Sequence, residues 1–214
     1  MTRFIAAALM LTAASLPQAQ AQIADSATAV RPILVGSAAP AVNLTTLDGK
    51  TTTLSALLAG KPTVLVFYRG GWCPFCNLQL SELRKLNPDL KAQGFQLLAI
   101  SPDRAEELAK TVEKDELDYT LASDAKAEAL QAFGIAFKVD DATLEKYAEY
   151  GINLETASGE KHHALPVPSV FVIDAQGVIQ FSYVNPDYRT RVPQRLIRAA
   201  VEAVAAGETG RPLK

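Results

Sequence analysis

The sequence predicts an α/β protein in which a mixed central sheet carries helices on both faces. Two continuous apolar runs, PTVLVFY at 62–68 and FQLLAIS at 95–101, are typical of strands buried on both faces of a largely parallel sheet. A segment of helical periodicity follows each run. Two further apolar runs near the C-terminus flank a short turn and predict an antiparallel pair. This order of elements builds one mixed sheet.

The first elements lie before the sheet core. Residues 22–35 are small and polar and are expected to form a flexible lead-in. Residues 43–53 alternate around a turn at Asp48-Gly49 and predict an extra N-terminal β-hairpin. A single helical turn is expected over 54–58, directly before the first buried strand.

Three helices are expected in the middle of the chain. The first runs from Cys73 to Leu86 and is expected to end at Asn87-Pro88. The second spans 103–114, with Ser101-Pro102-Asp103 as its cap and first turn. Asp124 is expected to cap the third, within AKAEALQAFGI.

The C-terminal part contains an insertion, two strands and a final helix. Residues 137–164 are polar and charged, with some helix expected in ATLEKYAEYG. VPSVFVID and VIQFSYV then form the antiparallel pair, and an Ala-rich helix covers 192–206. The sequence therefore predicts one domain at 36–206 and a C-terminal tail at 207–214.

The composition limits the classes of partner. The 214 residues are 49% hydrophobic and 21% charged, which allows a packed core. The net charge is −2 and no basic run occurs, so neither nucleic acid nor an anionic membrane surface is expected as a partner.

The first 21 residues have the layout of a secretory signal. Arg3 precedes an apolar stretch from Phe4 to Leu16, and Ala19-Gln20-Ala21 forms a small-x-small cleavage site. The stretch is shorter than the roughly 20 residues that span a bilayer, which argues against an uncleaved anchor. We therefore expect a secreted or periplasmic protein that is not inserted in a membrane after cleavage.

The chain has only two cysteines, in the segment VLVFYRGGWCPFCNLQL between a buried strand and a helix. A structural staple, two metal ligands and a redox-active dithiol are the three alternatives. A staple is a poor explanation because Cys73 and Cys76 close a very short loop, and entropic stabilisation grows with loop length. A helix N-terminus lowers the pKa of Cys73 and makes it a nucleophile. Cys76, one turn deeper, can resolve a mixed disulfide, and Pro74 suits a first helical turn.

These motifs carry a resemblance to known proteins. WCPFC after VLVFYRGG resembles the thioredoxin-fold redox motif, and Pro168 in VPSVFVID matches the cis-proline that faces the dithiol in that superfamily. The wider frame, from Gly36 to Val184, is similar to the AhpC/TSA (alkyl hydroperoxide reductase/thiol-specific antioxidant, peroxiredoxin-like) family. The resemblance implies a thioredoxin-like fold and protein disulfides or hydroperoxides as substrates. It also implies an external thiol-redox partner and no cofactor.

The sequence departs from the peroxiredoxin pattern at several positions. Arg69, Cys73 and Cys76 align with the proline, the threonine and the peroxide-attacking cysteine of that pattern. The arginine that such enzymes place before the last motif falls on Pro168. The activating hydroxyl and cation are therefore expected to be absent. The buried carboxylate of thioredoxins falls on Phe67, which leaves the proton acceptor for Cys76 open.

Two neighbours of the dithiol have alternative interpretations. Trp72 is expected to form part of a docking surface rather than only the core. Arg69 is either a solvated loop cation or a group that lowers the thiolate pKa.

Three functions follow in order of expectation. The first is an exported thiol-disulfide oxidoreductase in which Cys73 attacks and Cys76 resolves. The second is hydroperoxide reduction, with a sulfenic acid on either cysteine. The third is a Cu(I)-binding chaperone of the Sco type, in which Cys73, Cys76, His162 and His163 hold the metal; otherwise no metal is expected.

Overall fold

A computed structural model describes residues 22–210 of the chain. The expected signal segment 1–21 and the last four residues of the expected tail lie outside the described residues. No helix of the described part is long and apolar enough to cross a membrane.

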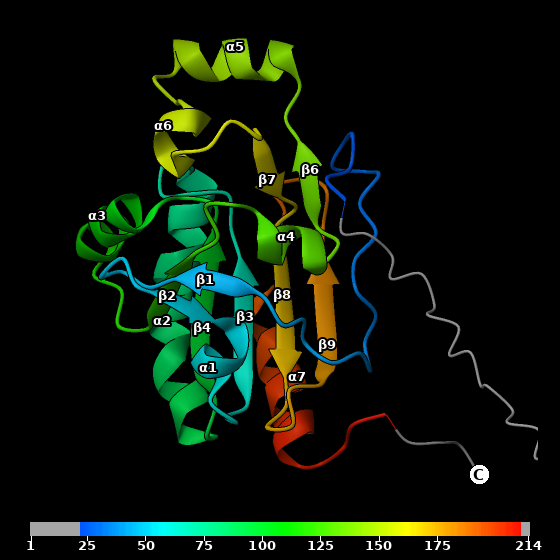
Figure 1. The fold of residues 1–214 in the computed structure, drawn as a ribbon. Helices are drawn as coiled ribbons and strands as arrows, with labels where there is room; N and C mark the ends of the chain where they lie inside the picture. The colour runs from blue at the N-terminus through cyan, green and yellow to red at the C-terminus, as the bar shows by residue number, and fades with distance from the viewer. Residues whose placement is uncertain (1–21, 211–214) are drawn as a thin grey trace, which may run out of the picture.

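A seven-stranded mixed sheet forms the centre of the described chain (Figure 1), with strand order β2-β1-β5-β4-β3-β8-β9. β3, β4 and β5 are parallel to one another, and β8 is antiparallel to β3. The strands are β1 (Asn43–Thr45), β2 (Thr51–Thr53), β3 (Thr63–Phe67), β4 (Gln96–Ser101), β5 (Thr120–Ser123), β8 (Ser169–Ile173) and β9 (Ile179–Val184). The predicted mixed sheet and N-terminal hairpin are confirmed.

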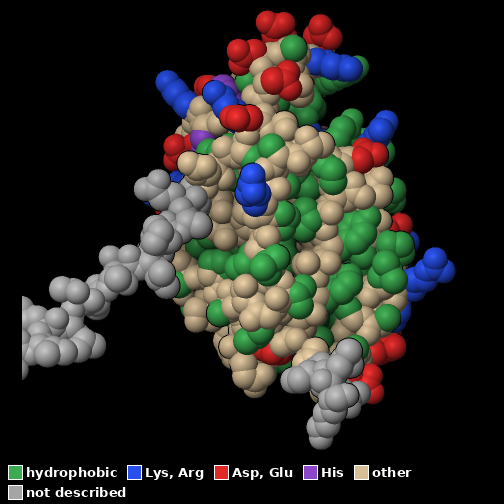
Figure 2. Space-filling view, turned by 90° about the vertical axis from the view of Figure 1, so that its right-hand side faces the viewer, with side chains coloured by type: hydrophobic (Ala, Val, Ile, Leu, Met, Phe, Trp, Pro, Cys, Tyr) green, Lys and Arg blue, Asp and Glu red, His purple; other side chains and the backbone are tan. Residues whose placement is uncertain are grey.

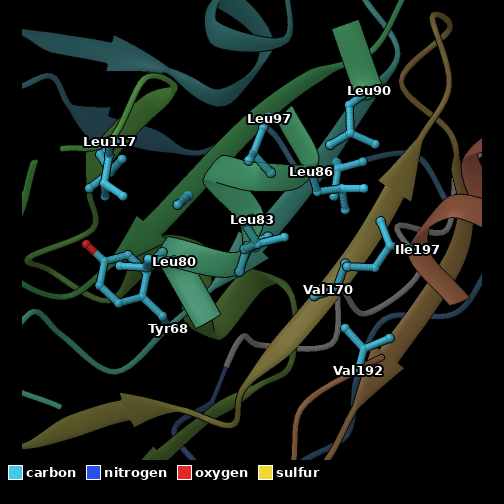
Figure 3. Close-up of a cluster of buried hydrophobic side chains, with 14 of the residues drawn as sticks. Tyr68, Leu80, Leu83, Leu86, Leu90, Leu97, Leu117, Val170, Val192 and Ile197 are labelled. Carbon is cyan, nitrogen blue, oxygen red and sulfur yellow. The ribbon is translucent and has the colours of Figure 1, made fainter. Parts of the chain in front are cut away.

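Helices cover both faces of this sheet, as predicted: α2 (Pro74–Ala92), α3 (Ala105–Asp115) and α7 (Gln194–Ala205) pack on one face, and α1 (Leu54–Leu58) and α4 (Glu128–Ala132) pack on the other. The two remaining helices, α5 (Asp141–Glu149) and α6 (Leu154–Ser158), lie beyond one end of the sheet (Figure 1). Side chains alternate along β3, so Val64 and Val66 face a core with α2, α3 and α7. Leu65 and Phe67 face a second core with α1 and α4. Figure 3 shows the first core, which also buries both cysteines.

Helix α2 is longer than predicted, because Pro88 does not end it. Leu83, Leu86 and Leu90 are fully buried, so the apolar face continues through the proline. Asn87 is also buried, and its side-chain amide donates to the Asp118 carboxylate at 3.0 Å. Packing and this hydrogen bond offset the one backbone bond that Pro88 cannot make.

The segment 22–35 has more fixed structure than the sequence predicted. Its Ala24 forms a bridge with Phe137, and Arg31 N donates to Gly134 O at 3.0 Å. Gly134 has φ +66, and a Cβ there would lie 2.0 Å from Arg31 O. The expectation of a flexible lead-in was therefore wrong, because this segment is bonded to the chain around α4.

The insertion at 137–164 contains the predicted helix, α5. The insertion also contains α6. Its two ends pair as a two-stranded antiparallel sheet of β6 (Ala136–Lys138) and β7 (Ala164–Pro166). Neither α6 nor this sheet was predicted. α5 has no buried side chain. In Figure 2, which faces the right-hand side of Figure 1, acidic and basic side chains gather at the end where α5 lies, while hydrophobic ones spread over the middle.

The expectation of a cis-proline at Pro168 was wrong. The described residues contain no cis peptide bond, so the bond from Val167 to Pro168 is trans. The chain runs on from β7 to β8, with Val167 N donating to Ile135 O at 2.9 Å. The trans form is the lower-energy default for such a bond. Pro168 lines a small cleft with Gln79 and Arg191.

Candidate active site

The two cysteines lie at the N-terminus of α2, directly after the loop that connects it to β3. Cys73 is the N-cap residue of α2 with extended backbone (φ −92, ψ 113), and Pro74 occupies the first turn. Proline suits this position because its missing N–H has no intrahelical partner there. Cys76 N donates to Cys73 O at 3.0 Å, which sets the two residues one turn apart. The predicted strand–loop–helix setting of the dithiol is what the structure shows.

Two glycines make the loop before Cys73 possible. Gly70 has φ +149, and a Cβ there would lie 2.3 Å from Trp72 Nε1. A Cβ on Gly71 would lie 1.9 Å from Thr111 Oγ1 on α3. A side chain at Gly71 would push the loop away from α3, and one at Gly70 would displace Trp72 and Asp103, so both glycines allow close packing around the loop.

Both cysteines are free thiols in this structure, and both are buried. Cys73 is 2% exposed and Cys76 is 0% exposed. The hydrogen bond from the Cys76 thiol is the largest cause that lowers the pKa of Cys73 to about 6, with Arg69 adding to it. Burial raises the pKa of Cys76 well above its ordinary value. The site therefore holds a thiolate at Cys73 and a thiol at Cys76 near neutral pH.

Two arginines supply positive charge to this pair. Arg69 is only 4% exposed, which excludes the alternative of a solvated loop cation. Arg191, between β9 and α7, donates from Nη2 to Cys76 Sγ at 3.4 Å. Pro168 occupies the family's arginine position, and the cations near the dithiol come from other positions, Arg69 and Arg191.

Aromatic rings surround the Arg69 guanidinium. Its carbon lies 5.2 Å from the Trp72 ring centroid, 5.6 Å from that of Tyr147 and 4.3 Å from that of Tyr188. Such contacts stabilise a buried cation. Arg69 Nη2 also donates to Tyr147 Oη on α5. The insertion is thereby joined to the active-site loop.

The exposed aromatic surface beside the dithiol is formed by other residues than Trp72. Trp72 is half-buried, and its ring lies 5.6 Å from Tyr147. Phe75 and Tyr188 are 40% and 42% exposed, and their rings pack edge to face at 5.7 Å. A docking role for Trp72 stays a prediction.

Asp103 is a site residue that the sequence did not reveal. It was expected only to cap a helix, but it is 2% exposed and its Oδ2 accepts from Gly71 N at 2.7 Å. Burial raises the pKa of Asp103 to about 7, and the Cys73 charge contributes to that rise. The sequence signal that could have revealed Asp103 is its position just after β4. Because β4 is parallel to β3, the residues that follow the two strands lie at the same edge of the sheet.

The histidines do not join the cysteines. His162 Nδ1 accepts from Ala164 N at 2.8 Å, and its Nε2 lies 2.7 Å from Ala125 O. His163 Nε2 lies 2.9 Å from Glu155 Oε1. Across residues 22–210 no group of three or more His, Cys, Asp or Glu side chains is arranged to hold a metal ion. The Cu(I) alternative is therefore withdrawn, since both ring nitrogens of His162 are already bonded to backbone.

The AhpC/TSA family matches residues 35–182, well over half of the chain and including both cysteines. The chain belongs to the AhpC/TSA family. Putative peroxiredoxin bcp of Haemophilus influenzae is 36% identical over 106 residues, covering 50% of this chain and 68% of that protein. Peroxiredoxin Bcp of Escherichia coli is 32% identical over 106 residues, covering 50% and 67%.

Solved structures agree with this family in fold. Peroxidoxin BcpB of Mycobacterium tuberculosis superposes with a TM-score of 0.61 at 22% identity, covering 79% of this chain and 97% of that one. Reduced Prx3 of Vibrio vulnificus in complex with H₂O₂ gives 0.65 at 21% identity, covering 79% and 99%. This AhpC/TSA protein has a thioredoxin-like fold and is a thiol-dependent oxidoreductase.

Proposed function

We propose that this AhpC/TSA protein reduces hydroperoxides, with Cys73 as the attacking sulfur and Cys76 as the resolving sulfur. The Cys73 thiolate attacks the distal oxygen of the hydroperoxide, forms a sulfenic acid and releases an alkoxide that takes up a proton. The Cys76 thiol then attacks this sulfenic acid, so that a disulfide forms and water leaves. An external thiol partner returns the disulfide to two thiols by exchange.

The observation that carries this proposal is a thiolate that is nearly closed to solvent. Cys73 has a pKa of about 6 yet is only 2% exposed. A small hydroperoxide needs little room to reach such a sulfur. A protein disulfide must instead bring one of its sulfurs, together with the attached polypeptide, into contact with the Cys73 sulfur. Steric access therefore limits disulfide exchange far more strongly than peroxide reduction. The similarity of this chain to proteins named as peroxiredoxins supports the same ranking.

The assignment of the attacking sulfur differs from the family frame, in which Cys76 has the position of the attacking cysteine. Burial keeps Cys76 protonated at neutral pH because it raises its pKa. Cys73 instead is the N-cap residue of α2, where the Cys76 thiol, Arg69 and the backbone N–H of Cys76 stabilise its charge. The sulfur that is charged is the better nucleophile.

Disulfide exchange is the second candidate, and it was the first expectation from the sequence. The exposed Phe75–Tyr188 pair beside the dithiol supports it, because a protein substrate could pack on these rings. Direct comparison of substrates separates the two candidates.

The test uses the reduced chain from residue 22 onward and its only tryptophan, Trp72, as a fluorescent reporter beside Cys73. We expect hydrogen peroxide or an organic hydroperoxide to oxidise the pair much faster than the protein reduces insulin disulfides. Cys73→Ser should abolish the reaction, whereas Cys76→Ser should leave a sulfenic acid that dimedone traps on Cys73. Faster insulin reduction would overturn the ranking. A reactive Cys73→Ser variant would overturn the assignment of the sulfur.

We also propose that the protein is exported, as the layout of residues 1–21 suggests. In a Gram-negative host the product would then be periplasmic, where its thiols need a dedicated reductant to stay reduced. Intact mass of the expressed full-length chain should show a new N-terminus at Gln22. A chain that keeps residues 1–21 in the cytosolic fraction would contradict this.

A further inference from the structure

Two guanidiniums act on the dithiol from separate parts of the chain, that of the buried Arg69 and that of the half-buried Arg191. Arg69 follows β3, and Arg191 precedes α7. Arg191 Nη2 donates to Cys76 Sγ at 3.4 Å, and the charge of the Cys73 thiolate opposes the lowering of the Arg69 pKa that burial causes. The two cations also repel each other. Burial is the main cause that lowers the pKa of Arg69, and the charge of Arg191 lowers it further.

Neither arginine has a carboxylate partner within the described residues. All the ion pairs of that part of the chain involve other groups, among them the exposed pair of Arg189 with Asp187. Three buried N–H groups, Arg69 Nε, Arg191 Nε and Arg191 Nη1, have no hydrogen-bond partner there. Buried charges are costly unless paired, so this arrangement calls for an anion.

In the reduced protein the Cys73 thiolate supplies one negative charge to these cations. Oxidation converts a thiolate and a thiol to a disulfide and releases one proton and two electrons. The disulfide is neutral, so the positive charge around it rises by one. Asp103 offsets this only in part, because burial raises its pKa to about 7.

We propose that Arg69 and Arg191 form an anion site that fills when Cys73 and Cys76 are joined in a disulfide. A carboxylate fits the fork of a guanidinium, and Arg191 has two unpaired N–H groups to offer it. The inference rests on the redox cycle of the proposed function and deepens it, because a reductant that carries a carboxylate beside its thiol would use this site.

The test is a redox equilibrium without peroxide. The dithiol is equilibrated with mixtures of oxidised and reduced dithiothreitol, in sodium formate or in sodium gluconate of equal ionic strength, so that a small carboxylate is compared with a bulky one. Formate should favour the oxidised form. If only that form binds, the oxidised-to-reduced ratio rises about elevenfold at ten times the formate Kd, which is about 30 mV for two electrons.

Variants assign the effect to the site. Arg191→Gln should abolish it, and Arg191→Lys, which keeps the charge without the fork, should weaken it. Arg189→Gln removes a nearby exposed arginine that already has a carboxylate partner and should change nothing. Circular dichroism shows whether each variant is folded. Equal ratios in formate and gluconate would overturn the proposal, and so would an equal loss in Arg189→Gln.

A second arm identifies where the anion comes from. The protein disulfide is reduced with 3-mercaptopropionate or with neutral 2-mercaptoethanol, and rates are compared per thiolate. A faster reaction with 3-mercaptopropionate that formate inhibits assigns the site to the reductant's carboxylate. Equal rates with an intact formate effect assign it to a free anion. Because no arm uses peroxide, failure here leaves the peroxidase assay to be judged separately.

Discussion

Replacing Cys76 by alanine should raise the pKa of Cys73 substantially. The Cys76 thiol is the first of the groups that stabilise the Cys73 thiolate, whose pKa is about 6. A hydrogen bond to a charged group contributes about 1.5–3 kcal/mol, which corresponds to roughly one to two pKa units. Cys76→Ala should therefore have a Cys73 pKa of about 7–8. Cys76→Ser keeps a donor and should stay close to the wild-type value.

The assay is the pH dependence of iodoacetamide alkylation, with peptide mapping to assign the modified sulfur in the wild type. The thiolate fraction at pH 6 drops from about half to roughly 1–10%, so alkylation of Cys76→Ala should slow about 5- to 50-fold. At pH 9 the rates should converge. Equal profiles for the alanine and serine variants would refute the hydrogen-bond explanation, and a wild-type Cys73 that titrates near 9 would refute the thiolate itself.

Three other predictions concern Asp103 and two glycines. The folded-state pKa of Asp103 is raised to about 7, so the stability that its neutral form contributes is full below pH 4 and is lost as pH rises to 7. The melting temperature of Asp103→Asn should therefore rise relative to that of the wild type as pH increases from 4 to 7. A constant difference between the two melting temperatures would contradict this. Gly71→Ala should cost about 1–3 kcal/mol in urea unfolding because its Cβ meets Thr111 Oγ1. Adding Thr111→Ala should recover most of that loss, and a double variant no more stable than Gly71→Ala would be the wrong result. Gly134→Ala should speed hydrogen exchange at the amides of Arg31 and Ile33, whereas Gly159→Ala, with a similar positive φ but no atom near the added Cβ, should not. Equal exchange in both variants would mean that backbone strain alone, not the contact with Arg31 O, is responsible.

Much of the fold is readable in the sequence because its strands and helices have clear periods. The apolar runs at β3 and β4 and the turns at Gly49 and Gly177 are local signals, and each produced the expected element. The predicted end of the helix at Pro88 was wrong because the tertiary packing of α2 overrides a local helix breaker. The prediction for segment 22–35 was wrong because its order comes from backbone hydrogen bonds to Phe133, Gly134, Ala136 and Lys138, which are distant in sequence.

The candidate site divides in the same way. Cys73 and Cys76 could be found from the chain because a strand, a loop and a helix place them in one continuous stretch. Asp103 and Arg191 could not, because they reach the dithiol from β4 and from the loop before α7. No local pattern marks a charged residue that reaches the site only when separate elements assemble. Arg69 was noticed, but its burial under three rings depends on α5 and on Tyr188.

The most direct test is a single turnover of the fully reduced chain with one equivalent of hydrogen peroxide. The account predicts that the peroxide disappears far faster than with a free thiol, and that mass mapping finds one disulfide between Cys73 and Cys76 per peroxide consumed. Peroxide loss at the free-thiol rate, with both sulfurs still open to alkylation after denaturation, would contradict it.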